Sequence, residues 1–503
     1  MLINKGNAQV TFQKSFGSTL GNAYIGTNDV SVLQTYDGGY CLGGTINANN
    51  GDIFLLKLNS IGDTLWTKTF GGNFDDILFS VAQTFDSGFI LAGQTRSFST
   101  GITDAYLIRT DASGNLVWSK NYGGFDSEWF SSIQQTDDSG FIACGSTFTF
   151  GSGIQDIYLV KIDPFGNIKW TKTIGGSGWD RASSIQQTFD KGFIITGSTT
   201  SFTAASGRIY LVKTDKNGSL VWSNILGGVM GEGGHCVRQC KDSSFVVTGY
   251  TNSFGAGAQD VFLLKTDESG NLQWMKTYGG VWEDIGYHVE QTSENGFIVT
   301  GRTQSFGSGS GVYLLKTNAI GDTLWTRAYG NIISNGYCVK QSNDGGYIIA
   351  SNPNTLNAIK TDSFGHVGCN EYNTNTIINS ISPVQLTGAL TGSGGIANNA
   401  ATITRYTPVT FGALCLATNI GDAFIEPNKI NVYPNPFADR LTFTSSKNEQ
   451  ATIILFDIFF RQILQQTFTN STTINTEHLA DGIYFYELRN SNLIIANGKA
   501  IKH

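Results

Sequence analysis

The sequence predicts an all-β protein, a seven-bladed β-propeller followed by a small β-sandwich. Three observations predict the propeller. A tryptophan returns in four steps of 52 residues and one of 51, at Trp66, Trp118, Trp170, Trp222, Trp274 and Trp325. Each repeat holds four short runs of alternating apolar and polar residues bounded by Asp, Gly, Asn or Ser, the pattern of half-buried strands. Four strands in about 50 residues match one propeller blade, whose faces are buried only by neighbouring blades.

Seven copies of the innermost strand support seven blades: Val30–Thr35, Ser80–Thr84, Ser132–Thr136, Ser184–Thr188, Cys236–Cys240, His288–Thr292 and Cys338–Ser342. A further copy of the outer, tryptophan-type strand precedes them all, with Phe12 in the tryptophan position. We therefore expect the N-terminal strand to complete the last blade, which leaves no free sheet edge. The turn Asp362–Gly365 offers a rival, with Cys369 in the tryptophan position, and we expect that segment to depart from the ring.

The turn before four of the six tryptophans reads Asp-x-x-Gly-x-x-x-Trp, as in Asp111–Trp118, and Asn59 and Asn318 replace the aspartate before Trp66 and Trp325. This element resembles the repeat of quinoprotein-like propellers, in which the aspartate and glycine shape the turn and the tryptophan docks between blades. The resemblance covers residues 12–369. It implies an architecture rather than a chemistry, because one fold hosts many functions.

Composition excludes several classes of protein. The 503 residues include 62 glycines and 7 prolines, with 14% charged and 12% aromatic residues, which indicates a folded chain rich in tight turns. The net charge of −7 is mild and forms no basic stripe, so no nucleic-acid partner is expected. No apolar run approaches the roughly 18 residues of a membrane helix. We expect a monomer.

The chain divides into four segments. Residues 1–8 are expected to be the remnant of a signal peptide, because Gly6-Asn7-Ala8 looks like the small-residue end of one. Residues 9–369 hold the propeller, and residues 370–425, rich in Asn, Thr, Ser and Gly, indicate a linker or an extension along an edge. Residues 426–503 contain about seven short alternating strands, the spacing of a β-sandwich.

The C-terminal domain resembles the type A sorting domain of substrates of the type IX secretion system. The residues that carry this resemblance are Tyr433, Pro434, Asn435, Pro436, Asp457, Gly482, Tyr484, Lys499 and Lys502. One departure is Phe460, where the family usually has glycine. The resemblance implies recognition by the type IX machinery and transport across the outer membrane. It also implies removal of the tail, with the remainder attached to the cell surface or secreted.

Seven cysteines are an odd number for an exported protein. Five stand where other repeats have Ser, Thr or small apolar residues, and we expect buried thiols there: Cys41, Cys144, Cys236, Cys240 and Cys338. Cys236 and Cys240 lie roughly 13 Å apart along one strand, too far for a disulfide. Cys369 and Cys415 bracket the linker, and a disulfide between them is an open alternative in an oxidising compartment.

Two registers of charged residues recur with the repeat. Five acids open the innermost strands at intervals of 52: Asp76, Glu128, Asp180, Glu232 and Asp284. They could ring the channel mouth and hold a calcium-like cation, which would be the one cofactor of the protein. Alternatively, each caps the backbone N–H groups of its own Gly-Gly loop, the interpretation we favour. A basic residue on the third strand of every blade, such as Lys161, is expected to cover an apolar face or pair with a carboxylate.

Three tryptophans, Trp129, Trp179 and Trp282, fall outside the docking register and near Asp180 and Asp284. Aromatic faces beside hydrogen-bond acceptors suit a sugar ring, so these five residues form the predicted ligand site on the loop face. The alternative is that each tryptophan plugs a gap between blades, which we favour for Trp129.

We predict no catalytic residues. His235 and His288 lie one place apart in the repeat register, so they should point to opposite strand faces. No Ser-His-Asp set, phosphate loop or zinc motif is present. The sequence favours a secreted or surface-attached protein that binds a glycan or another surface protein. A hydrolase or lyase acting on polysaccharide through two mouth carboxylates is the first alternative, and a passive surface scaffold is the second.

Overall fold

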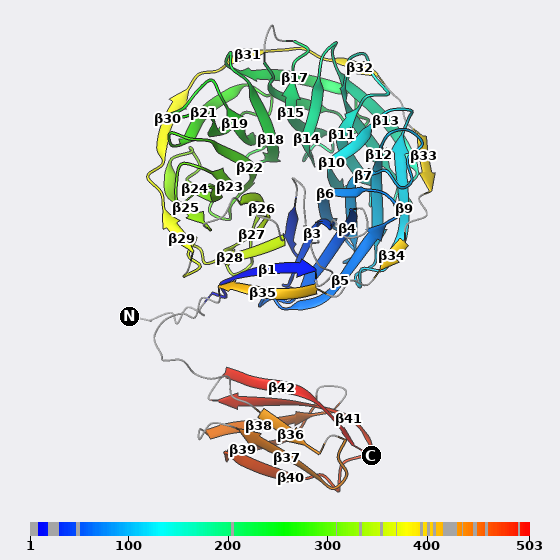
Figure 1. The fold of residues 1–503 in the computed structure, drawn as a ribbon, viewed down its shortest axis with the longest axis vertical. Helices are drawn as coiled ribbons and strands as arrows, with labels where there is room; N and C mark the ends of the chain where they lie inside the picture. The colour runs from blue at the N-terminus through cyan, green and yellow to red at the C-terminus, as the bar shows by residue number, and fades with distance from the viewer. Residues whose placement is uncertain are drawn as a thin grey trace. The chain divides into compact units, whose positions relative to one another are not determined.

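The computed structural model consists of two compact units, residues Met1–Thr418 and Asn419–His503, and contains no helix among the residues that it describes. Those residues are 9–18, 30–46, 51–202, 206–307, 309–330, 334–352, 356–368, 370–392, 396–399, 403–405, 409–415, 430–434, 436–445, 450–457, 461–490 and 493–502. The first unit is a closed ring of seven antiparallel sheets around a central channel (Figure 1). The predicted propeller is confirmed.

Each blade has four strands that run outward from the channel, and blades 1 to 7 are numbered in chain order. The innermost strands are β2 (Ser31–Gln34), β6 (Asp76–Gln83), β10 (Glu128–Gln135), β14 (Asp180–Gln187), β18 (Glu232–Gln239), β22 (Asp284–Gln291) and β26 (Asn335–Gln341). The second strands are β3 (Tyr40–Ile46), β7 (Phe89–Thr95), β11 (Phe141–Thr147), β15 (Phe193–Thr199), β19 (Phe245–Thr251), β23 (Phe297–Thr303) and β27 (Tyr347–Asn352).

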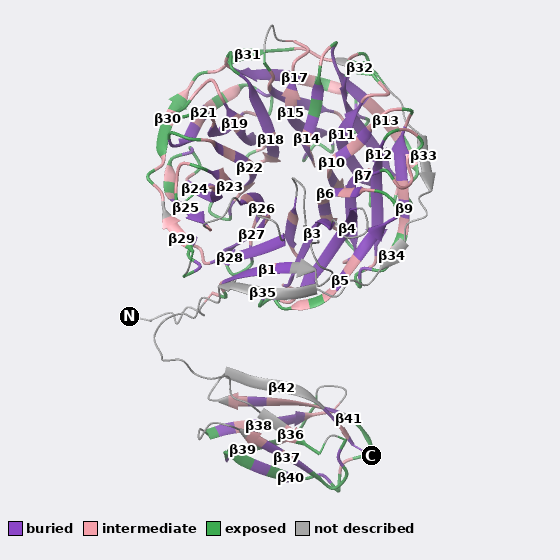
Figure 2. Ribbon diagram, in the orientation of Figure 1, coloured by how far each residue is buried: buried purple, intermediate pink, exposed green. Residues whose placement is uncertain are grey.

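The third strands are β4 (Asp52–Leu58), β8 (Asp104–Thr110), β12 (Asp156–Ile162), β16 (Arg208–Thr214), β20 (Asp260–Thr266), β24 (Gly311–Thr317) and β28 (Leu356–Thr361). The fourth strands are β5 (Thr64–Gly71), β9 (Leu116–Gly123), β13 (Ile168–Gly175), β17 (Leu220–Gly227), β21 (Leu272–Gly279), β25 (Thr323–Tyr329) and β1 (Phe12–Ser18). The second and third strands are almost wholly buried, because the two faces of each blade are covered by the blades on either side (Figure 2).

The N-terminal strand closes the ring. β1 pairs antiparallel with β28 of blade 7, in a register that sets Phe12 opposite Lys360 and Phe16 opposite Leu356. The predicted closure is therefore confirmed. After the turn at Asp362 the chain leaves blade 7 and next pairs with β25 of blade 6.

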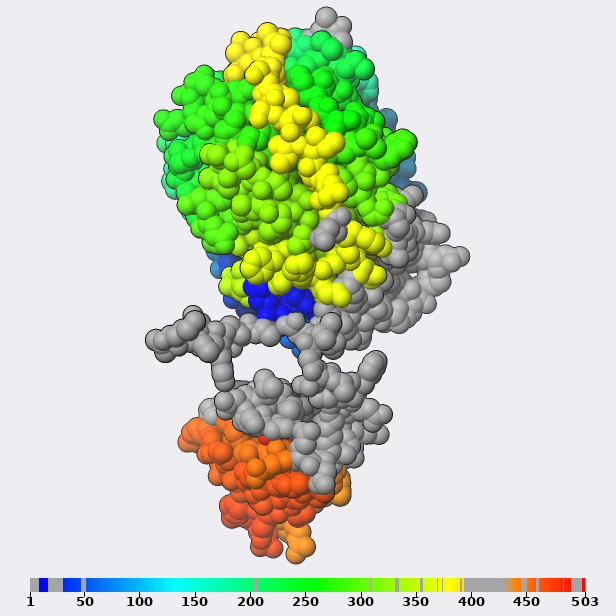
Figure 3. All heavy atoms as spheres, turned by 90° about the vertical axis from the view of Figure 1, so that its left-hand side faces the viewer, coloured from blue at the N-terminus to red at the C-terminus, as the bar shows by residue number. Residues whose placement is uncertain are grey.

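Seven short strands between Glu371 and Cys415 form a belt around the outside of the ring. The sequence predicts a linker or an edge extension for this segment. The strands are β29 (Glu371–Asn373), β30 (Ile377–Ile381), β31 (Val384–Leu386), β32 (Leu390–Gly392), β33 (Ile396–Asn399), β34 (Ile403–Arg405) and β35 (Val409–Cys415). Each adds a fifth strand to one blade, and the belt visits blades 6 to 1 in descending order before it ends on β1 of blade 7. Figure 3 shows the first part of the belt, in yellow, crossing the side of the ring.

Neighbouring blades are joined through the repeated tryptophan. Each indole packs on the glycine of the Asp-x-x-Gly or Asn-x-x-Gly turn in the next blade, as Trp170 does on Gly218, where a Cβ atom would lie 2.8 Å from the ring. Gly218 also has φ of +77°, so glycine is needed there for backbone conformation as well as for space. Phe12 makes the same contact with Gly62, which explains why phenylalanine serves at the closing strand.

The basic residue of every blade pairs with the acid of the inner hairpin turn in the same blade. Lys161, for example, lies 2.9 Å from Asp138, and its side chain is buried up to the charged end. The other pairs are Lys57–Asp37, Arg109–Asp86, Lys213–Asp190, Lys265–Asp242, Lys316–Glu294 and Lys360–Asp344. The expected pairing with a carboxylate is confirmed, and the repeated basic residue has a structural role in each blade.

The second unit contains two antiparallel sheets, which supports the predicted small β domain. One holds β36 (Ile430–Tyr433), β37 (Arg440–Ser445) and β40 (Ser471–Asn475). The other holds β39 (Gln462–Thr469), β38 (Gln450–Phe456), β41 (Gly482–Asn490) and β42 (Leu493–Lys502). Their apolar faces form one core that includes Phe437, Leu441, Ile453 and Leu488.

The residues of the predicted sorting signal occupy different environments. Tyr484 is buried, and its hydroxyl donates to the carbonyl of Ala480 at 2.6 Å. Lys502 is buried over the ring of Phe437, and its ammonium group donates to the carbonyl of Ala438 at 2.6 Å. Tyr433, Pro434 and Pro436 are exposed, Asp457 pairs with Arg461, and Gly482 opens β41. Asn435, Phe460 and the side chain of Lys499 lie outside the described residues.

Candidate functional site

The innermost strands of all seven blades line a central cavity of about 1000 Å³. Six innermost strands, β6, β10, β14, β18, β22 and β26, carry a β-bulge in the described residues. In β18 the bulge is the shift between Gly234 and Cys236. A bulge sets two residues of one strand opposite a single residue of its partner. Two consecutive residues of each bulged strand therefore line the channel.

The bulge corrects one expectation. His235 and His288 were expected to point to opposite strand faces, because side chains alternate along a regular strand. Both histidines line the channel, since His235 is the extra residue of the bulge in β18 and His288 follows the bulge in β22. The strict alternation fails at these positions.

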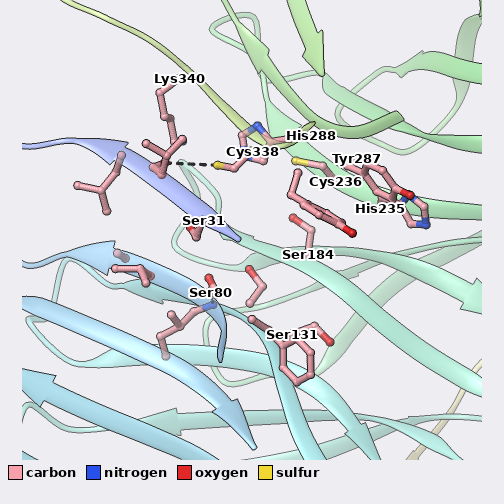
Figure 4. Close-up of a pocket in the computed structure, with 18 of the residues that line it drawn as sticks. Ser31, Ser80, Ser131, Ser184, His235, Cys236, Tyr287, His288, Cys338 and Lys340 are labelled. Atoms are coloured by element: carbon pink, nitrogen blue, oxygen red, sulfur yellow. Dashed lines mark hydrogen bonds between the residues drawn. The ribbon is translucent and has the colours of Figure 1, made fainter. Parts of the chain in front are cut away.

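The channel wall is not sevenfold symmetric. At the two bulge positions, blades 1 to 4 present mostly serine, as in Ser131 with Ser132 and Ser183 with Ser184. Blades 5 to 7 present a histidine or tyrosine followed by a cysteine or histidine: His235 with Cys236, Tyr287 with His288, and Tyr337 with Cys338. Figure 4 shows His235, Tyr287, His288 and Lys340 in one part of the channel wall and Ser31, Ser80 and Ser131 in another, with Ser184 next to His235 and Tyr287.

Three rings on adjacent blades form a continuous row, in which His235 and Tyr287 are stacked and Tyr337 is tilted by 36° from Tyr287. The ring of Tyr287 lies 5.3 Å from that of His235, at an interplanar angle of 13°, and 5.0 Å from that of Tyr337. His235 Nδ1 lies 2.8 Å from the carbonyl of Gly286. Since a carbonyl only accepts, Nδ1 carries the proton and donates, and Nε2 is the acceptor of the neutral ring. Burial lowers the pKa of His235 below its usual 6.5, which favours that neutral form.

A cationic cluster lies beside the stack. Arg238 donates from Nη2 to Nε2 of His288 at 2.8 Å. Burial, and then the charges of Arg238 and Lys340, hold the pKa of His288 well below 6.5, so this ring is neutral and protonated on Nδ1. That Nδ1 is buried and has no hydrogen-bond partner among the residues that the structure describes. Lys340 pairs with Glu290 across neighbouring blades.

The five acids of the predicted ring lie away from the channel lining. Asp76, Glu128, Asp180, Glu232 and Asp284 are at most 1% exposed, and the cavity is lined by other residues. Four of them accept the N–H of their own Gly-Gly loop at 2.7–2.8 Å, as Asp180 does from Gly176. Glu232 accepts from the Thr251 hydroxyl at 3.3 Å. Burial raises the pKa of Asp76 and Asp284. This geometry is that of turn caps.

The three tryptophans of the predicted ligand site fall into two groups. Trp129 packs against Phe148 with ring centroids 6.0 Å apart, and Phe148 meets the Trp179 ring edge to face at 5.6 Å. The Arg181 guanidinium lies 5.3 Å from the Trp179 ring on the same blade. Trp282 belongs to the loop before β22, two blades further on, where it is 63% exposed. The structure thus joins Trp129 and Trp179 into one aromatic ladder and leaves Trp282 separate.

The cysteines show two outcomes. Cys41, Cys144, Cys236, Cys240 and Cys338 are free and buried, as expected. Cys369 and the side chain of Cys415 lie outside the described residues, so the proposed disulfide stays a prediction. Over the described ranges, no three His, Cys, Asp or Glu side chains converge as they would to hold a metal ion.

A ring of seven glutamines was missed from the sequence. The last residue of each innermost strand is glutamine: Gln34, Gln83, Gln135, Gln187, Gln239, Gln291 and Gln341. Each Oε1 accepts a backbone N–H from the inner turn of the preceding blade at 2.7–3.0 Å. The signal was present, because this glutamine recurs in every repeat. Only the fold shows that its partner belongs to the neighbouring blade.

Comparison with known proteins identifies the C-terminal unit. A family described as a secretion system C-terminal sorting domain matches residues 431–502. This match indicates type IX export to the cell surface or the extracellular space. In the described part of the chain, no helix is long and apolar enough to cross a membrane. No curated protein matches the chain.

Several solved structures resemble the chain weakly. A Dyadobacter fermentans protein of unknown function is 9% identical, with 70% of this chain and 98% of that chain covered and a TM-score of 0.41. A fungal alcohol oxidase in complex with copper is 12% identical, with 97% and 99% covered and a TM-score of 0.44. The extracellular domain of a putative hybrid two component system from B. thetaiotaomicron is 8% identical, with 94% and 68% covered and a TM-score of 0.35. At these scores the likeness supports no argument about activity.

Proposed function

We propose that this exported protein binds a glycan on the loop face of its propeller, with Trp179 as the platform for a sugar ring. One observation carries the proposal: Trp179 is held from two directions, by Phe148 and by Arg181, and still leaves 39% of its surface exposed. Exposing indole surface to water is unfavourable. A large aromatic ring that is held rigid and left open is suited to stacking against the apolar face of a sugar.

Polar groups beside the ring suit the hydroxyls of a sugar. Thr200 donates toward the backbone of Trp179 and accepts from its N–H at 2.9 Å, so it fixes the loop. Arg181 is exposed, and its Nε donates to Gln155 at 2.7 Å, which holds the guanidinium against the indole and leaves its outer N–H groups toward solvent. A preorganised ring and donor lower the ordering cost of binding.

The enzymatic alternative is less well supported. A glycosidase of the usual kind needs two carboxyl groups about 5–10 Å apart that can reach the bond to be broken. The acids expected to do this, Asp180 and Asp284 among them, are buried and accept hydrogen bonds from their own loops. A passive scaffold does not explain why the indole of Trp179 is held in place by its neighbours and still exposed to solvent.

The test is a glycan array probed with the full chain, followed by titration of each bound glycan with two variants. Trp179→Ala is expected to weaken binding at least tenfold. Phe189→Ala is the matched control, because Phe189 is an exposed aromatic at the other end of β14, in the inner turn. It is expected to bind as the wild type does. Binding by Trp179→Ala as tight as that of the wild type, or an array on which no glycan is bound, would refute the proposal. A protein ligand would then be the favoured alternative.

A further inference from the structure

The charges that line the channel are unevenly distributed. Blades 4 to 7 contribute Arg181, Arg238, Arg302 and Lys340, against one acid, Glu290. Among the described residues that line the cavity, blades 1 to 3 contribute no charged side chain. The chain as a whole carries a net charge of −7, so this cationic wall is a local feature that opposes the overall charge. A cleft lined by one sign of charge attracts ligands of the opposite sign.

Two of these cations have no carboxylate partner. Lys340 pairs with Glu290, and Arg302 pairs with Glu283. Within the described residues, neither Arg181 nor Arg238 is in an ion pair. Arg181 contacts Gln155 and the Trp179 ring, while Arg238 contacts Ser184, the carbonyl of Val237 and His288. An unpaired guanidinium in a concave site is suited to recognising a carboxylate or a sulfate, since its donors are fixed in a fork.

His288 supplies a second, independent observation. The side chain is only 9% exposed, and its Nδ1 donor has no partner. Buried polar groups are nearly always hydrogen-bonded, and the exceptions need an explanation. Here Nε2 is occupied by Arg238, which fixes the proton on Nδ1 beside the guanidinium. Arg238 and His288 thus form a hydrogen-bonded pair at one place on the channel wall.

The cationic wall is continuous with the proposed sugar platform. Arg181 lies on the Trp179 ring and also lines the channel, so it joins the loop face to the interior. The rings of His235, Tyr287 and Tyr337 offer another apolar face in the same cavity, and Figure 4 shows the first two of them near His288, the residue that Arg238 contacts. A cavity of about 1000 Å³ is at the upper end of the usual range for ligand sites, roughly 300–1000 Å³.

We infer that the glycan is anionic and that an acidic sugar, bearing a carboxylate or a sulfate ester, enters the channel and is held by Arg238 against the Tyr287 stack. This inference rests on the proposed function and adds the class of glycan. Arg238 and Arg181 supply the charge, and the aromatic rings supply the stacking surface. His288 positions Arg238 through the bond to Nε2.

The experiment is calorimetric titration of the full chain with three hexasaccharides: a uronic acid oligomer, a sulfated oligomer and a neutral oligomer. The wild type is expected to bind at least one acidic oligomer at least tenfold more tightly than the neutral one, with affinity that falls as salt rises. The comparison of the two acidic oligomers tells a carboxylate ligand from a sulfate ligand. Arg238→Gln is expected to remove most of the preference for the acidic oligomer and to leave binding of the neutral oligomer in place. Arg181→Gln is expected to weaken binding of both oligomers, because Arg181 also holds the Trp179 ring, and to weaken binding of the acidic oligomer more.

Lys216→Gln is the matched control, because it removes one positive charge from an exposed turn outside the channel lining. It is expected to retain the preference. Equal affinity for acidic and neutral oligomers would overturn the inference and leave the proposed glycan binding intact. A wild type that binds none of the three, and no glycan on the array, would overturn both. Arg181→Gln keeps the test decisive if Arg238→Gln does not fold, since Arg181 is exposed.

Discussion

The backbone N–H of Asn343 donates to Oε1 of Gln34 at 2.9 Å, across 309 residues of sequence. This bond joins blade 7 to blade 1 and completes the ring of seven glutamines. The same glutamine donates from Nε2 to Gly38, in the turn of its own blade, at 3.3 Å. The ring is thus closed in two places: on the outside by β1, and around the channel by Gln34.

Replacing Gln34 with alanine is expected to lower the free energy of unfolding by about 1 kcal/mol, the usual net contribution of a hydrogen bond. Gln34→Glu keeps an acceptor for Asn343 and loses only the bond to Gly38, so it should cost less. Denaturant unfolding of both variants beside the wild type measures the difference. If alanine and glutamate at this position give the same stability as glutamine, the ring is not a source of stability.

Gly218→Ala is expected to be much more destabilising than Gly38→Ala. Both glycines have positive φ, of +77° and +79°, so an L-residue is strained to a similar extent at each. A Cβ at Gly38 meets nothing within 4 Å, whereas one at Gly218 would lie 2.8 Å from Trp170. We expect losses of about 1 kcal/mol at Gly38 and about 2–4 kcal/mol at Gly218, because overpacking adds to the backbone strain. Similar midpoints of thermal unfolding for the two variants would mean that the indole moves aside.

The repeat accounts for what could be predicted and what could not. The blade count and the closing strand follow from the 52-residue period, because Phe12 stands in the position of Trp66. The belt carries no such signal: strands such as β29 and β31 hold three residues each and pair with the blades through the backbone. Nothing in their side chains marks the partner.

The candidate site, too, could be predicted from the sequence only in part. Trp179 stands out in the sequence as an extra tryptophan and Arg181 follows it by two residues, but Phe148 comes close to Trp179 only in the fold. His235 and His288 were placed on opposite faces because a bulge cannot be read from alternation alone. Positions at which one repeat differs from the others, such as Tyr287, proved more informative about the channel than positions shared by all.

Asp260→Asn is expected to flatten the pH dependence of stability between about pH 4 and pH 6. Burial, with a smaller contribution from the charge of Asp284, raises the pKa of Asp260 from 3.8 to about 6. The folded state therefore binds this proton more tightly than the unfolded state. The stabilisation is complete below pH 3.8 and is lost as pH rises to about 6. Asparagine keeps the acceptor for the N–H groups of Ala256 and Gly257.

Unfolding of wild type and Asp260→Asn should be compared at pH 4.5 and pH 7.5. The variant is expected to gain on the order of 1–2 kcal/mol relative to the wild type at the higher pH. Asp267→Asn is the control, because Asp267 lies in an exposed turn and its pKa is lowered, so its effect has the opposite sign and appears below pH 4. If the free energies of unfolding of wild type and Asp260→Asn differ by the same amount at both pH values, the pKa of Asp260 is not raised in the folded state.

Removal of the belt is expected to make the propeller self-associate. The belt strands cover the outer edges of β5, β9, β13, β17, β21 and β25, and an uncovered edge strand is free to pair with another chain. A chain that ends at residue 368 should therefore elute as aggregates or oligomers in size-exclusion chromatography with light scattering. A chain that ends at Thr418 keeps the belt and loses only the second unit, so it should have the mass of a monomer. If both truncated chains are monomeric and have equal unfolding midpoints, the belt neither protects the sheet edges from association nor stabilises the ring.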